Sequence, residues 1–178
     1  MYAFGYVTPM GYSPQKDAKN NLIAPEQYGS RNDALAFAQR TRTNLEFINR
    51  AHLQNEAVHP ITQTVNSLLG LVIFIKEKEL VESVEKLTLA HLCSEGWPRI
   101  DVRLGQCETL GDFVHHLRNA AAHGRILFSS DSTDSNKVAI TFSDKKAKAT
   151  KINWRVQMNV SDLETFCLRF IEMLLERR

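Results

Sequence analysis

Apolar residues recur at helical spacing along two consecutive segments in the first half of the chain. From Asn32 to about Glu56 they alternate with arginine and asparagine in the pattern of a long amphipathic helix. Pro60 suits the first turn of a second helix, whose apolar face continues to Val72. Because only a short bend separates the two segments, they are predicted to form an antiparallel helical hairpin.

The period changes from 3.6 to 2 in the last third of the chain. Two runs in which apolar and polar residues alternate predict the strands of a β-hairpin. Their apolar positions are Val138, Ile140 and Phe142 in the first run, and Trp154, Val156 and Met158 in the second. The lysine-rich connection between the runs is interpreted as a solvated turn. Ser161 and Glu164 then match a capping box before a C-terminal amphipathic helix.

The remaining segments give weaker signals. Residues 77–93 have charges on one side and leucines on the other, which favours a shorter helix. The segment from Trp97 to Gly105 is predicted to be a loop, with Trp97 packed on the core. Residues 1–30 contain scattered glycines and prolines and are predicted to be an irregular arm. The pattern therefore predicts a mainly α fold over residues 31–178, an antiparallel helical bundle with a β-hairpin inserted before the last helix.

Composition agrees with this fold and restricts the number of domains and the classes of function. A chain of 178 residues with 43% hydrophobic and 24% charged residues is typical of one globular domain. The net charge of +2 neither indicates nor excludes binding to nucleic acid. Cys93, Cys107 and Cys167 lack metal-ligand spacing, so reduced thiols within the core and no metal cofactor are expected.

The same sequence features predict a cytoplasmic location. The longest apolar run, Leu68–Ile75, is far shorter than a bilayer requires, so no contact with a membrane is expected. The first fifteen residues lack the basic start and apolar stretch of a signal peptide.

The stretch FVHHLRNAAAHGR, residues 113–125, carries the candidate chemistry. On a helical wheel, one side of residues 110–123 is apolar and predicted to face the core. The opposite side presents His115, Arg118, Asn119 and His123, together with small residues that leave room for close approach. Thr109 or a neighbouring residue is predicted to start this helix, and Gly124 is the predicted residue that ends it.

These polar side chains are the types that RNA cleavage requires. Histidine titrates near neutrality and can act as general base or acid, while arginine binds phosphate through two parallel hydrogen bonds. His123, in the last turn, is favoured as a proton donor by the helix dipole. Asn119, one turn earlier, is placed to orient the ring of His123. On spacing alone, the polar side of this helix could also be an ordinary solvent-exposed face. That interpretation is preferred for His115 and His116.

The segment LRNAAAHG resembles the R-x4-H motif of the HEPN superfamily, the higher eukaryotes and prokaryotes nucleotide-binding domains. The match consists of Arg118, Asn119 and His123 near the end of a helix. The preceding helical hairpin, and the strand pair and final helix that follow, are similar to a prokaryotic, often plasmid-borne HEPN subgroup. The predicted bundle is therefore HEPN-like.

The resemblance implies a metal-independent endoribonuclease without a cofactor, in which the motifs of two subunits face each other across a homodimer interface. Arg118 and His123 would be catalytic, Asn119 supportive, and the products a 2′,3′-cyclic phosphate and a 5′-OH. Such proteins commonly act as toxins or in defence, so an antitoxin or a defence-system partner is a further expectation.

One position departs from the toxins that are controlled by tyrosine modification. Arg125 occupies the place of their tyrosine, so that control is not supported. Arg125 and His115 are instead possible substrate-binding residues. Two alternatives stay open: a non-catalytic HEPN module that binds nucleic acid or a protein partner, and a structural helical protein outside the superfamily.

Overall fold

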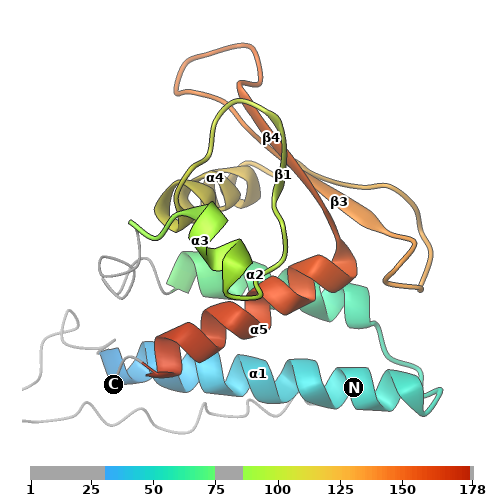
Figure 1. The fold of residues 1–178 in the computed structure, drawn as a ribbon. Helices are drawn as coiled ribbons and strands as arrows, with labels where there is room; N and C mark the ends of the chain where they lie inside the picture. The colour runs from blue at the N-terminus through green and yellow to red at the C-terminus, as the bar shows by residue number, and fades with distance from the viewer. Residues whose placement is uncertain (1–30, 75–85, 177–178) are drawn as a thin grey trace, which may run out of the picture.

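The computed structural model describes residues 31–74 and 86–176. This part of the chain contains five helices and four strands (Figure 1). In chain order they are α1 (Arg31–Leu53), α2 (Pro60–Phe74), α3 (Leu89–Ser94), β1 (Asp101–Leu104), α4 (Leu110–Ala122), β2 (Ile126–Phe128), β3 (Ala139–Asp144), β4 (Trp154–Asn159) and α5 (Val160–Glu176). The predicted arm, residues 1–30, and most of the helix predicted over 77–93 lie outside the described residues.

The fold is mixed α and β, so the prediction of a mainly α bundle with an inserted hairpin is wrong. The predicted hairpin exists as β3 and β4, but it forms the centre of a four-stranded antiparallel sheet in the order β1-β4-β3-β2. The two edge strands, β1 and β2, are short and largely exposed. They show no apolar alternation because pairing with the central strands, rather than burial of a face, holds them in place.

The helical hairpin is confirmed. α1 and α2 pack against each other, and α5 packs against both (Figure 1). Their contact faces carry buried apolar side chains such as Leu45, Leu68 and Phe170. Within the described residues, no helix combines the length and apolar character needed to cross a membrane.

One face of the sheet packs on the helices. On β3, Ile140 and Phe142 are fully buried, and their antiparallel partners on β4 are also buried. Asp144 continues this alternation and pairs with Trp154, so its side chain also faces the helical layer. Because α4 packs directly on β3, this register places a carboxylate against α4.

Two sequence predictions fail where tertiary contacts replace local signals. In the described part of residues 77–93, the helix begins only at Leu89, because Thr88 is extended and bridges Thr109. The predicted loop before Gly105 contains strand β1. Trp97 does pack on the core, with its ring 5.5 Å from that of Phe166.

The capping box predicted at Ser161 and Glu164 does not form the start of α5. The helix begins at Val160, directly after β4, so Ser161 is already helical. The Glu164 carboxylate instead accepts a hydrogen bond from the Asn49 side chain of α1. Strand β4 therefore sets the start of α5, while Glu164 helps to join two helices.

Gly105 lies at the end of β1 with φ +81°, and a Cβ there would lie 2.5 Å from the carbonyl oxygen of Asn153. We expect Gly105→Ala to lower the free energy of unfolding by about 2 kcal/mol, from a positive φ plus a backbone clash. Gly124→Ala is the matched control, since φ is +60° there but the space is open. Urea denaturation should show the larger loss at Gly105; equal losses would contradict the clash.

The three thiols differ in burial, which corrects the prediction that all lie in the core. Cys167 is buried, Cys107 is partly buried and Cys93 is exposed. Burial, with a further contribution from the Asp112 charge, raises the pKa of the Cys107 thiol to about 12. We expect a thiol reagent at neutral pH to label Cys93 quickly and the other two only after unfolding. Fast labelling of all three in the native protein would contradict this.

Candidate functional site

Helix α4 is defined by local signals at both ends. At its start, the Thr109 hydroxyl accepts a hydrogen bond from the Asp112 amide, and the Asp112 carboxylate accepts one from the Thr109 amide. At its end, Gly124 adopts φ +60°. The amide of Arg125 then donates to the carbonyl of Ala120 at 2.8 Å, as in a Schellman motif. Both predicted ends are confirmed.

The two sides of α4 also follow the prediction. The buried side consists of Leu110, Phe113, Val114, Leu117 and Ala120. On the other side His115 and His123 are exposed, and Arg118 is partly buried. His123 is the C-cap residue and its amide donates to the Asn119 carbonyl. The imidazole of His123 therefore lies at the exposed end of the helix, next to small residues.

Asp144, at the end of β3, lies at the centre of a polar cluster beside α4. Its Oδ2 lies 2.8 Å from Nδ1 of His116 and accepts a hydrogen bond of 3.0 Å from the Asn119 side chain. Its Oδ1 accepts from the Arg125 guanidinium at 3.3 Å and from the Lys145 amide at 2.7 Å. The carboxylate thus links the middle of α4, the segment after α4 and the β3–β4 turn.

This cluster is largely shielded from water. The Asp144 side chain is 6% exposed and that of Arg125 20%. Burial acts to raise the pKa of Asp144, but the hydrogen bonds from His116, Asn119 and the Lys145 amide outweigh it and lower the pKa below the usual value. Asp144 is therefore ionised at neutral pH, and an ionised carboxylate requires Nδ1 of His116 to be the donor.

His116 and Asn119 do not have the surroundings that the sequence suggested. The His116 ring stacks on Trp154 at a centroid distance of 4.5 Å, so the interpretation of His116 as part of a solvated face is wrong. The Asn119 amide donates to Asp144 and lies 3.1 Å from Nε2 of His115. Asn119 thus orients His115 rather than His123.

The structure brings only some of the candidate residues together. Asn119, His115 and Arg125 belong to the network around Asp144, directly or through one hydrogen bond. Arg118 and His123 are five positions apart on one helix, which separates their directions by about 140° around the axis. The two residues that the motif makes catalytic therefore do not converge on one point of a single subunit.

Sequence reasoning missed Asp144. The residue lies in a charged stretch, SDKKAK, that reads as a turn. The signal that could have found it is the period of 2, because Ile140, Phe142 and Asp144 continue one alternation. A carboxylate at the next inward position of a buried strand indicates a paired side chain rather than a solvated one.

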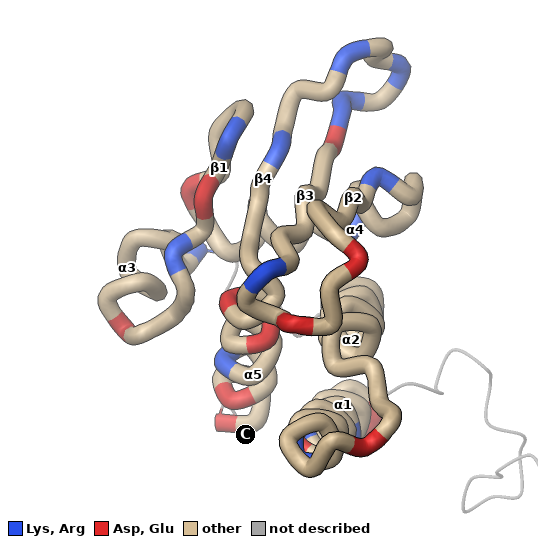
Figure 2. The backbone as a smooth tube through the Cα atoms, turned by 90° about the vertical axis from the view of Figure 1, so that its right-hand side faces the viewer, with Lys and Arg blue, Asp and Glu red and all other residues tan. Residues whose placement is uncertain are grey.

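Positive charge gathers close to this cluster. Figure 2 shows Lys and Arg segments along the connection between β3 and β4 and at the start of β2. The connection carries Lys145, Lys146, Lys148 and Lys151, of which the last three are exposed. Within residues 31–74 and 86–176, no group of three or more His, Cys, Asp or Glu side chains is placed to hold a metal ion.

Comparison with known proteins gives one match. The family model described as HEPN pEK499 p136 matches residues 18–178, which is most of the chain and begins inside the segment predicted to be an arm. Neither the curated proteins nor the solved structures that were compared with the chain include a match.

Proposed function

This chain belongs to the HEPN pEK499 p136 family, and we propose that it is a metal-independent endoribonuclease with an active site shared by two subunits of a homodimer. The observation that carries the proposal is the end of α4. There an exposed histidine, His123, follows a partly buried arginine, Arg118, in the R-x4-H arrangement on a helix held rigidly to the sheet. HEPN domains are commonly ribonucleases, which agrees with this chemistry.

The proposed reaction needs only the groups on this surface. One His123 imidazole takes the proton of the 2′-OH, whose oxygen attacks phosphorus and forms the cyclic ester. The bond from phosphorus to the 5′ oxygen breaks, and a protonated His123 from the other subunit supplies the proton to that leaving oxygen. Arg118 neutralises the charge on the phosphate oxygens. The products are a 2′,3′-cyclic phosphate and a 5′-OH.

The angle between Arg118 and His123 supports a shared site. A two-fold axis near Ala122 would bring His123 of one subunit toward Arg118 of the other. Ala122 is exposed and small. Apart from its two chain neighbours, no described residue has an atom within 4 Å of a Cβ added at Gly124, so there is room for close approach at this end of the helix. Each catalytic pair would then consist of His123 from one subunit and Arg118 from the other.

The remaining candidate residues take supporting roles in this proposal. The network through Asp144 fixes the direction of α4, and hence of His123, before RNA binds. Asn119 orients the exposed ring of His115, which would contact the substrate. The guanidinium of Arg125 is already paired with the Asp144 carboxylate, so a contact with phosphate would have to be made from within that ion pair. The main role of Arg125 is therefore to hold the segment after α4. The lysines of the β3–β4 connection would contact the RNA backbone.

Incubation of a labelled RNA with the protein in EDTA tests the proposal. We expect cleavage that continues in the chelator, with products that carry a 2′,3′-cyclic phosphate and a 5′-OH. Sedimentation should show a dimer. A stable dimer that does not cleave RNA would contradict the nuclease and favour a non-catalytic HEPN module that binds nucleic acid or a protein partner.

We also propose that the nuclease serves as a toxin or in defence, with an antitoxin or a defence-system protein as its partner. Induced expression in a bacterial host should then arrest growth, and His123→Ala should remove that effect at an equal protein level. Unchanged growth with the wild-type protein at a level that cleaves cellular RNA would contradict the toxic role.

A further inference from the structure

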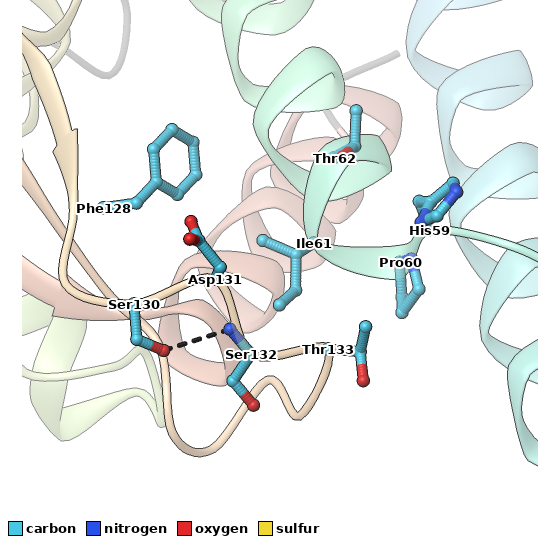
Figure 3. A pocket seen from close by; sticks show the side chains of 9 residues that line it. All are labelled: His59, Pro60, Ile61, Thr62, Phe128, Ser130, Asp131, Ser132 and Thr133. Carbon is cyan, nitrogen blue, oxygen red and sulfur yellow. Dashed lines mark hydrogen bonds between the residues drawn. The ribbon is translucent and has the colours of Figure 1, made fainter.

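A cavity of about 270 Å³ lies between the start of α2 and the loop that follows β2 (Figure 3). One side is lined by Ile61 of α2 and by His59, which directly precedes that helix; the other side is lined by Phe128 and Asp131. In Figure 3, the Phe128 ring and the Ile61 side chain lie on two sides of the hollow, and the Asp131 carboxylate points between them. These residues take no part in the proposed cleavage reaction.

We propose that this cavity binds a guanine base of the RNA strand, with Phe128 stacking on the base and Asp131 accepting hydrogen bonds from its edge. Phe128 is 49% exposed, which is unusual for a phenylalanine in a strand and leaves a ring face available. Aromatic rings beside polar groups are the usual way in which proteins hold an unpaired base of single-stranded RNA.

The charges of the lining favour a base over a phosphate. The described residues around the cavity include the carboxylate of Asp131 but no lysine or arginine. A carboxylate repels phosphate, and its oxygens only accept hydrogen bonds. Among the described residues, no side chain or backbone group pairs with the Asp131 carboxylate. Both of its oxygens are therefore available to a ligand that donates.

Among the four bases of RNA, guanine fits a carboxylate best. Its Watson–Crick edge presents a ring N–H and an adjacent amino group, so it can donate two parallel hydrogen bonds to one carboxylate. Adenine and cytosine place an acceptor nitrogen beside their amino group, and the ring N–H of uracil lies between two carbonyls. Each of these would bring an acceptor against Asp131. A site whose carboxylate oxygens are unpaired therefore selects guanine over the other three bases through hydrogen bonding.

The loop that carries Asp131 is fixed by its own hydrogen bonds. The Ser130 hydroxyl accepts from the Ser132 amide at 3.1 Å, and the Ser129 hydroxyl accepts from the Ala139 amide at 2.9 Å. The backbone on both sides of Asp131 is therefore held in place before a base arrives, which reduces the entropy cost of ordering this loop on binding.

The cavity also lies close to the proposed cleavage site along the chain. Arg125, two positions after His123, is three residue steps from Phe128, which is about 10 Å in ideal strand geometry. A base in this cavity would thus belong to a nucleotide near the bond that is cut. Only this assignment to the RNA substrate rests on the proposed function; binding of the base itself does not.

Fluorescence anisotropy with labelled five-nucleotide RNAs tests the inference. Each RNA carries one guanine, adenine or cytosine in a uridine background, and 2′-fluoro sugars remove the attacking hydroxyl so that binding is measured without cleavage. We expect the guanine RNA to bind the full chain about tenfold more tightly than the others. Asp131→Asn should remove this preference, and Phe128→Ala should weaken binding of every RNA about tenfold.

Leu127→Ala is the matched control, because Leu127 is 69% exposed on the same strand but does not line the cavity. It should leave every affinity unchanged. Equal binding of the guanine, adenine and cytosine RNAs, or a guanine preference that survives Asp131→Asn, would overturn the inference. Guanosine 5′-monophosphate should bind more weakly than the guanine RNA, and equal affinity would overturn the assignment to an RNA strand. Guanine binding without any cleavage would contradict the nuclease alone.

Discussion

His123→Ala is expected to slow RNA cleavage about 100-fold or more while the protein keeps its fold. The size of the effect follows from the loss of a general acid or base, and one substitution removes both if each subunit supplies one. The fold should persist because the His123 side chain is exposed. Its contribution to the end of α4 comes from its backbone amide, which alanine retains. Initial rates on a labelled RNA, measured beside thermal unfolding, check the prediction.

His91→Ala is the control for this substitution. It removes an exposed histidine from α3, which takes no part in the cluster around Asp144, and should leave the cleavage rate unchanged. Arg118→Lys should also lose most of the activity, since an ammonium group cannot reproduce the planar two-point contact with phosphate. Cleavage at the wild-type rate by His123→Ala would rule out the assigned role.

Asp144→Ala should lower the free energy of unfolding by about 3 kcal/mol, the largest stability effect that we expect from one polar side chain here. The substitution removes the shared acceptor of His116, Asn119 and Arg125, and it leaves a partly buried guanidinium without its counter-charge. Urea denaturation at neutral pH measures the loss. Asp101→Ala is the control, because its ion pair with Arg103 is exposed and should contribute less than about 1 kcal/mol.

The contribution of Asp144 to the free energy of unfolding should also depend on pH in a defined direction. Its pKa is lower in the folded protein than in the unfolded chain, so the folded state favours the ionised form. The stabilisation is therefore complete above the unfolded value of about 3.9 and is lost as the pH falls through the lower folded value. The difference in free energy of unfolding between the wild type and Asp144→Asn should shrink below about pH 4. A difference that grows with acid would contradict the assigned network.

Much of the helical layer could be predicted because its signals are local. Pro60 at the start of α2, Thr109 at the start of α4 and Gly124 at its end each act on backbone groups within one turn. The inward faces of α4 and of β3 followed from periodicity alone, because a core on one side selects the apolar positions. The R-x4-H spacing of Arg118 and His123 was likewise visible in the sequence.

Only the tertiary structure decided how these pieces combine. The edge strands β1 and β2 exist because β4 and β3 offer hydrogen-bond partners, and nothing in a stretch such as DVRL marks that in advance. Asp144 is separated from Asn119 by 25 positions, yet packing of α4 on β3 makes it the shared acceptor of the site. The sequence by itself determined the helix with its arginine and histidine. Long-range packing determined which side chains hold that helix, because a buried charge is stable only where the fold brings it partners.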